Sequence, residues 1–288
     1  MNKSVWIAAA VTLLFWSSAF AGIRAGILGG YSPGALVLLR FVVASSVFLL
    51  YALVKRVQPL QKKDLLRTIA MGLCGIFIYH TALTFGERVV PAGTASLLIA
   101  AAPVFTALIS VIVEKQRLYW RGWFGIALGM GGAALVTLGA GHTDSFTGSA
   151  LLILLSAVST SVFFVFQKPL YKTYKAIDLT AYFTWFGTIP MLVFLPQLTH
   201  EVTHASLMAT LSGIYIGIFP AAVAYVSWGY ALSKARTHEV ASLLYINPVL
   251  AVLVAWVWLD EKPQSIAIFG GIAAIIGVII VNSRREKA

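Results

Sequence analysis

The residues best suited to bind a small polar ligand lie inside long apolar runs. His80 is the one ionisable residue near the centre of such a run, and Tyr79 directly precedes it. Tyr225 lies 145 residues after His80, at a similar depth in another run. Histidine and tyrosine side chains could hydrogen-bond an amino or carboxylate group and stack on a ring. The alternative for His80 is a neutral imidazole bonded to a backbone carbonyl.

Further candidates lie on other apolar runs. Three aromatic residues could form the wall of a ligand pocket, although such residues more often pack between helices: Phe20, Phe163 and Trp185. Three polar residues lie on the two apolar runs that a central proline interrupts: Ser96, Tyr245 and Asn247. A serine at such a position can instead bond to a neighbouring helix. We predict that all six contribute to substrate binding.

The chain lacks the sequence patterns of common catalytic sites. No P-loop, no H-E-x-x-H motif and no G-x-S-x-G motif occurs. The single cysteine, Cys74, excludes an internal disulfide and a cysteine-based metal site. The ten Asp and Glu residues fall at helix ends or in loops of the arrangement derived below. We therefore predict no enzyme activity, no catalytic residue, no metal and no cofactor.

The composition is that of a membrane protein. Of the 288 residues, 59% are hydrophobic and only 11% are charged, with a mean hydropathy of +0.88. Soluble domains carry about 25% charged residues, so a cytosolic enzyme and a free nucleic-acid-binding domain are excluded. The apolar runs are continuous and near the ~20 residues of a membrane helix, about twice the length of a barrel strand.

Ten membrane helices joined by short loops account for these runs. This predicts an all-α membrane protein. The predicted spans are 5–27, 33–54, 68–86, 92–113, 120–140, 148–167, 178–197, 207–231, 238–258 and 265–282.

The basic residues orient the helices. The net charge is +11. In the predicted arrangement, 17 of the 21 Lys and Arg lie on the same side of the membrane as the N-terminus. The positive-inside rule identifies that side as cytoplasmic. Both termini are therefore expected in the cytoplasm. The four others fall at or near the outer side: Arg24, Arg40, Arg88 and Lys262. We expect Arg24 to snorkel to the outer headgroups and Arg40 to lock helices at the outer rim, with snorkelling as the alternative for Arg40.

The two halves of the chain resemble each other. The tetrad Ala-Ser-Leu-Leu at 95–98 recurs at 241–244, an offset of 146. Three further pairs recur at an offset of 145: Pro103 and Pro248, Gly125 and Gly270, and Gly132 and Gly277. This indicates an internal duplication, with repeats at 1–143 and 144–288. Each half has five spans, an odd number, so the second copy must be inverted relative to the first.

The repeated prolines indicate where a binding site lies. Pro103 and Pro248 fall at the centres of their predicted spans, where each removes a backbone hydrogen bond and kinks the helix. Inverted-repeat transporters bind substrate near the midplane, between corresponding interrupted helices. We expect these two helices to line a central cavity and to take part in gating. The alternative is a pair of purely structural kinks.

The sequence resembles a known family. Two copies of Ala-Ser-Leu-Leu, proline, an acidic residue near the helix end and two glycines are similar to the EamA domains of the drug/metabolite transporter superfamily. The family's other motifs have counterparts in the segments 14–20, 39–41, Glu114 and 260–261, with Ser17 where the family often has glycine. The resemblance implies a ten-helix inverted-repeat basket and metabolite efflux. Within the family, the chain is similar to bacterial exporters of aromatic and other amino acids.

We therefore expect a bacterial inner-membrane exporter of aromatic and other neutral amino acids that works by alternating access. Its expected partners are the amino-acid substrate and the lipid bilayer, with no nucleic acid, and the protein is expected to be a monomer. The lack of a carboxylate within a span favours a uniporter or exchanger over a proton relay. An exporter of another small metabolite or drug is the alternative, and a membrane-embedded transferase is a remote one.

The N-terminus offers a first test. Lys3, an apolar stretch and Ala19-Phe20-Ala21 resemble a signal peptide with a cleavage site. We expect the segment to be retained, because the repeat needs its helix. Intact-mass measurement of the purified protein checks this, and loss of the first ~21 residues would contradict the ten-helix topology.

Overall fold

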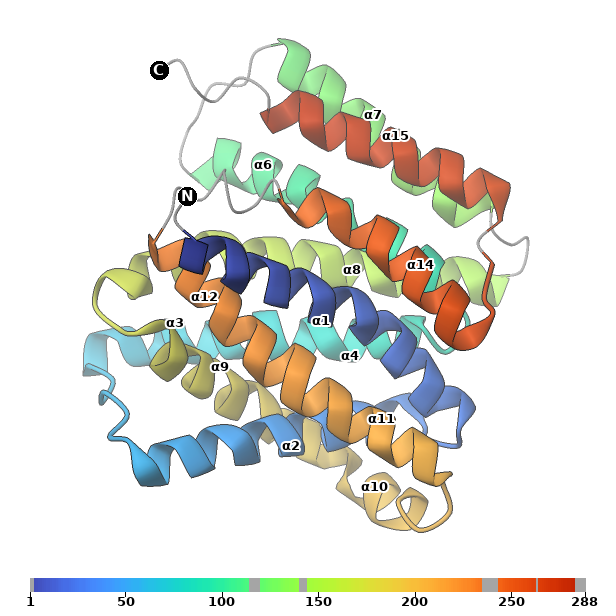
Figure 1. The fold of residues 1–288 in the computed structure, drawn as a ribbon. Helices are drawn as coiled ribbons and strands as arrows, with labels where there is room; N and C mark the ends of the chain where they lie inside the picture. Colours follow the sequence, from blue (N-terminus) through green and yellow to red (C-terminus); the bar gives the residue numbers. More distant parts are fainter. Residues whose placement is uncertain (1–2, 114–119, 140–143, 235–242, 263, 283–288) are drawn as a thin grey trace.

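The described residues of the computed structural model are 3–113, 120–139, 144–234, 243–262 and 264–282, and all their regular elements are helical (Figure 1). Five α-helices are unbroken: α1 (Lys3–Leu28), α2 (Pro33–Val54), α7 (Trp120–Gly139), α8 (Asp144–Gln167) and α15 (Ser265–Asn282). A short 3₁₀ segment, η2 (Lys168–Lys172), follows α8.

The remaining predicted spans are divided into shorter helices. The third consists of α3 (Lys62–Gly72), η1 (Leu73–Ile78) and α4 (Tyr79–Gly86), and the fourth of α5 (Ala92–Ile99) and α6 (Ala102–Val113). The seventh consists of α9 (Ala176–Met191), η3 (Leu192–Phe194) and α10 (Leu195–Glu201). The eighth consists of α11 (Leu207–Ile218), η4 (Phe219–Val223) and α12 (Ala224–Lys234), and the ninth of η5 (Leu243–Ile246) and α14 (Asn247–Leu259).

The all-α membrane fold is confirmed. Among the described residues, six segments are long and apolar enough to cross a membrane, and three apolar helices are shorter. The third span begins at Lys62, six residues before the predicted start, because a charged, mostly exposed turn at 62–67 extends the helix. The first part of the ninth span, residues 238–242, lies outside the described residues.

Both repeated prolines follow a break in their helix. Helical structure is interrupted at residues 100–101, and Pro103 is the second residue of α6. Pro248 is the second residue of α14, after the 3₁₀ turn η5. Proline suits the first helical turn, where its missing N–H would have no partner. The Ala102 carbonyl beside the first break accepts a hydrogen bond from the Ser161 hydroxyl at 2.7 Å, so a neighbouring helix satisfies it.

Two π-helical turns occupy equivalent places in the two halves. η1 begins at Leu73 and η4 at Phe219, an offset of 146 that matches the sequence repeat. Each turn ends one or two residues before the first polar aromatic candidates, Tyr79 and Tyr225. A π-turn widens the helix locally and rotates the side chains that follow it, and such turns are frequent at functional sites.

Repeated glycines hold α7 and α15 together. These two helices lie side by side at the top of Figure 1. A Cβ on Gly132 would approach the Gly270 carbonyl to 2.5 Å, and a Cβ on Gly277 would approach the Gly125 carbonyl to 2.5 Å. Gly125 is equivalent to Gly270 and Gly132 to Gly277, so the equivalents pair crosswise. Crosswise pairing requires the two helices to be antiparallel, as an inverted repeat demands.

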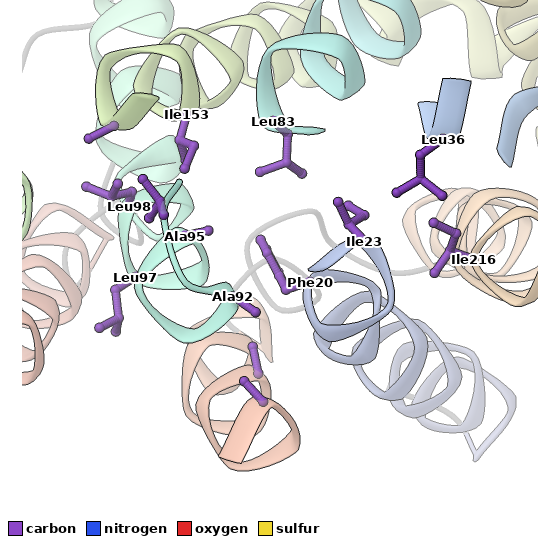
Figure 2. Close-up of a cluster of buried hydrophobic side chains, with 14 of the residues drawn as sticks. Phe20, Ile23, Leu36, Leu83, Ala92, Ala95, Leu97, Leu98, Ile153 and Ile216 are labelled. Atoms are coloured by element: carbon purple, nitrogen blue, oxygen red, sulfur yellow. The ribbon is translucent and has the colours of Figure 1, made fainter. Parts of the chain in front are cut away.

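An apolar cluster fills the part of the fold between α1, α4 and α5. Figure 2 shows Phe20 of α1 pointing into it, with Leu83 of α4 and Ala95 and Leu98 of α5 on the other sides. Phe20 is 4% exposed. A second cluster, around Phe41, Phe163, Phe183 and Tyr225, lies between α2, α8, α9 and α12. These clusters enclose the polar residues described next.

The glycine contacts predict that alanine substitutions at two adjacent glycines have very different effects on stability. Gly132→Ala should destabilise the protein by about 1–3 kcal/mol, because the new methyl group meets the backbone of α15. Gly131→Ala is the matched control, since nothing lies within 4 Å of its Cβ position. Thermal unfolding in detergent checks this. Equal melting temperatures for the two variants would contradict the close approach of α7 and α15.

Candidate functional site

The two polar aromatic candidates from the two repeats touch each other. The His80 Nε2 and the Tyr225 hydroxyl lie 3.0 Å apart, within hydrogen-bond distance. Both side chains are buried, at 2% and 8% exposure. The donor depends on the imidazole tautomer. The partner of His80 is therefore a side chain of the other repeat and not a backbone carbonyl.

Aromatic rings surround this pair. The Phe41 ring lies 4.6 Å from the imidazole between centroids, and the Tyr79 ring lies 4.4 Å from it in an edge arrangement. Trp16 of α1 contacts the Tyr225 ring at 5.2 Å. Its indole N–H donates to the Pro220 carbonyl of the π-turn η4 at 3.3 Å. The centre of the protein thus offers several ring faces around a few polar atoms, which is typical of small-molecule sites.

Arg40 joins the centre, whereas we expected it to lock helices at the rim or to snorkel. Its side chain is 2% exposed, and Nε and Nη1 have no hydrogen-bond partner. The guanidinium interacts electrostatically with Tyr225, Tyr79 and Glu87. Eight of the nine residues 33–41 are buried, so the outer half of α2 is covered by neighbouring helices and leaves no path to the headgroups.

Glu87 is a second buried ionisable residue, and it lies at a helix end as the sequence predicts. It caps the C-terminus of α4, and its side chain is 0% exposed. Neither carboxylate oxygen has a hydrogen-bond partner. Its nearest charged groups are, in order of influence, Arg40, Arg24 and Glu261. The sequence places Glu87 at a helix end, but it does not indicate that the side chain is buried.

An ion pair ties the ends of several helices together. Arg24 Nε lies 2.9 Å from a Glu261 oxygen, and Arg24 Nη1 donates to the backbone carbonyls of Glu87 and Arg88. The other Glu261 oxygen accepts from the Ala92 N–H at 2.9 Å, at the start of α5. Arg24 therefore binds protein groups and does not simply snorkel. These contacts hold the adjacent ends of α1, α4, α5 and α14 against one another.

Of the predicted site residues, the structure brings Tyr79, His80 and Tyr225 together. Ser96 donates to the Gly93 carbonyl of its own helix at 2.6 Å, so its hydroxyl is satisfied locally. Phe20 lies in the apolar cluster of Figure 2. These two residues are buried but do not contact the central pair.

The other predicted residues are spread more widely. Phe163 packs on Phe183 with ring centroids 5.2 Å apart, in the cluster that also contains Tyr225. The Trp185 indole donates to the Ser45 carbonyl and lines a surface hollow between α2 and α9, away from the centre. The Asn247 Oδ1 is buried without a partner. The side chain of Tyr245 lies outside what the structure describes.

Sequence reasoning did not select Trp16, Phe41, Arg40 or Glu87 as site residues. The available signal for Arg40 was an ionisable residue about seven residues inside an apolar run. In the described part of the chain, no group of three His, Cys, Asp or Glu side chains gathers as a metal site would need.

The hydrogen bond between His80 and Tyr225 can be measured by a double-mutant cycle. Tyr225→Phe should cost about 1–3 kcal/mol of stability, because it leaves a buried imidazole nitrogen unpaired. In a His80→Ala background the same change should cost at least about 0.5 kcal/mol less. Unfolding in detergent checks this. Tyr230→Phe is the control, since Tyr230 lies on the same helix and is exposed. Additive effects of the two changes would contradict the coupling.

The chain is similar to known membrane transporters. The model of the EamA-like transporter family matches the chain twice, at residues 3–138 and 147–283. The uncharacterized transporter YdfC of Bacillus subtilis is 38% identical over 288 residues, covering 99% of this chain and 94% of the relative. A probable terminal-alkyne amino-acid exporter of Streptantibioticus cattleyicolor is 38% identical over 284 residues, covering 99% and 95%. An uncharacterized transporter of Archaeoglobus fulgidus is 30% identical, covering 97% and 99%.

A solved crystal structure shares the fold, with a TM-score of 0.68 and 19% identity over 98% of both chains. The family match excludes the remote alternative of a transferase, and it confirms a multi-pass membrane transporter that is not an enzyme. The chain belongs to the EamA-like transporter family.

Proposed function

We propose that the protein exports aromatic and other neutral amino acids across a bacterial inner membrane, as YddG-type exporters do. The observation that carries this proposal is the buried His80–Tyr225 pair, where the two repeats meet among aromatic rings. The relative named as a probable terminal-alkyne amino-acid exporter, at 38% identity, supports an amino-acid substrate. Both termini are cytoplasmic and the protein works as a monomer in this proposal.

The inverted repeat supports alternating access. The central pair contains one residue from each half, so rocking one half against the other moves the two walls of the site relative to each other. The helix breaks before Pro103 and Pro248 give each half of the protein one place where a helix can bend. The Arg24–Glu261 ion pair closes the outer end in the conformation described here, and an outward-open state must separate it.

Glu87 changes one part of the expected mechanism. The preference for a uniporter or exchanger rested on the lack of a carboxylate at membrane depth. Glu87 is fully buried beside Arg40, so that argument against proton coupling no longer applies. The transport assay below therefore includes a pH gradient.

Uptake into proteoliposomes tests the proposal. The purified protein should give saturable transport of one or more members of a labelled amino-acid panel, with and without an imposed pH gradient. His80→Ala should lower kcat/KM by about tenfold or more, because it removes a buried hydrogen-bonding group from the site. Ser156→Ala is a matched control, since Ser156 is equally buried but bonds only to the Ile153 carbonyl of its own helix.

Two outcomes would contradict parts of this proposal. If no amino acid in the panel is transported, amino-acid export is contradicted, and the substrate is another small metabolite or a drug. Transport that is unaffected by His80→Ala would keep amino-acid export and remove His80 from the binding site.

A further inference from the structure

We propose that Arg40 and Glu87 together bind the two charged ends of a zwitterionic amino acid. In this site the guanidinium of Arg40 receives the α-carboxylate, and the carboxylate of Glu87 receives the α-ammonium group. The inference rests on the proposed function, because it names the groups by which that function recognises its substrate.

Arg40 offers hydrogen-bond donors that no protein group uses. Its Nε and Nη1 are buried without a partner, although an arginine normally directs its five donors to acceptors in a planar fork. A carboxylate is the ligand that matches this fork, with two parallel hydrogen bonds. A buried guanidinium without such a ligand carries a large desolvation penalty, so its position calls for an anionic partner.

Glu87 offers the complementary acceptors. Both of its carboxylate oxygens are buried and unpartnered, and the side chain is 0% exposed. Burial favours the neutral form of a carboxyl group, and an adjacent cation favours the ionised form. An ammonium group supplies both that positive charge and up to three N–H donors.

The two groups do not satisfy each other. They interact electrostatically, yet no Arg40 nitrogen lies within 4.0 Å of a Glu87 oxygen. Arg24 and Glu261, the other charges near Glu87, already form an ion pair with each other. A ligand that carries one negative and one positive end can therefore satisfy Arg40 and Glu87 at once.

The surroundings define where the ligand's side chain lies. Tyr79 and Tyr225 are among the groups that interact with Arg40, and the guanidinium carbon lies 5.4 Å from the centre of the Phe41 ring. A substrate held by Arg40 and Glu87 therefore places its side chain beside these rings and the His80 imidazole. This fits an aromatic or other neutral amino acid and disfavours one with a charged side chain.

Substrate analogues separate ligand recognition from a structural role. The test uses the amino acid that the parent transports best, its decarboxylated amine and its deaminated acid. Affinity is read by competition in proteoliposomes. Glu87→Gln should lower the affinity for the amino acid by between about 10- and 100-fold, because a charge-assisted hydrogen bond is lost. It should change the affinity for the deaminated acid by no more than about twofold, since that ligand has no ammonium group.

Arg40→Gln should show the opposite selectivity. It should lower the affinities for the amino acid and the deaminated acid alike. The affinity for the amine, which has no carboxylate, should change by no more than about twofold. Arg40→Lys should restore part of the affinity, because it keeps the charge but lacks the bidentate fork. Glu201→Gln is the matched acidic control, since Glu201 is an outer carboxylate bonded to the Ser32 N–H at 2.7 Å. It should change none of the three affinities.

The outcomes distinguish the two proposals. A parent protein that transports no amino acid contradicts the proposed function itself. If the parent transports amino acids but each variant changes the affinities for all three ligands equally, the function stands and the inference is overturned. Should the single variants fail to fold because one buried charge is left alone, the double variant Arg40→Gln with Glu87→Gln decides. Loss of its preference for the amino acid over both analogues supports the inference, and an unchanged preference overturns it.

Discussion

The structure depends on one constraint, which is that equivalent helices of the two inverted repeats meet each other. His80 and Tyr225 are 145 residues apart in the chain and 3.0 Å apart in space. The equivalent helices α7 and α15 meet in the same way, but their glycines pair crosswise: Gly132 packs on Gly270, and Gly277 packs on Gly125. Both contacts lie where a two-fold axis relating the halves must pass. A polar pair at the centre and a close backbone contact at the edge therefore have one origin.

This constraint explains why polar groups collect at the centre. Membrane helices gain little from burying apolar groups against one another, because lipid is equally apolar, so polar contacts and close packing must hold them. A substrate site at the repeat interface needs groups that are not fully satisfied by the protein. Arg40 and Glu87 have this property, whereas Ser96 and Ser156 bond to their own helices. The difference separates residues that hold the fold from those that are available to a ligand.

The sequence predicted the helices and the repeat well, because apolar length and a constant offset are properties of the chain itself. It also paired His80 with Tyr225, since an inverted repeat brings equal depths together. It failed for Arg40 and Glu87. Counting 1.5 Å per residue gives depth along one helix, but it does not say which neighbours cover that helix. Trp16 was missed for a related reason: its contact with Tyr225 joins α1 to α12, and no offset in the sequence encodes that pair.

Glu87 also connects the central residues to the Arg24–Glu261 ion pair. Arg40 is the charged group with the strongest electrostatic effect on its carboxyl group, and the Glu87 backbone carbonyl accepts a hydrogen bond from Arg24 at 2.9 Å. Arg24 is bound in turn to Glu261, whose second oxygen holds the start of α5. The 86–91 segment therefore connects the central charges to the Arg24–Glu261 ion pair. Any movement of Glu87 toward a central ligand acts on the backbone that Arg24 holds. In the proposed mechanism, recognition of the substrate and separation of the ion pair thus share one residue, which provides the link between site and gate that alternating access requires.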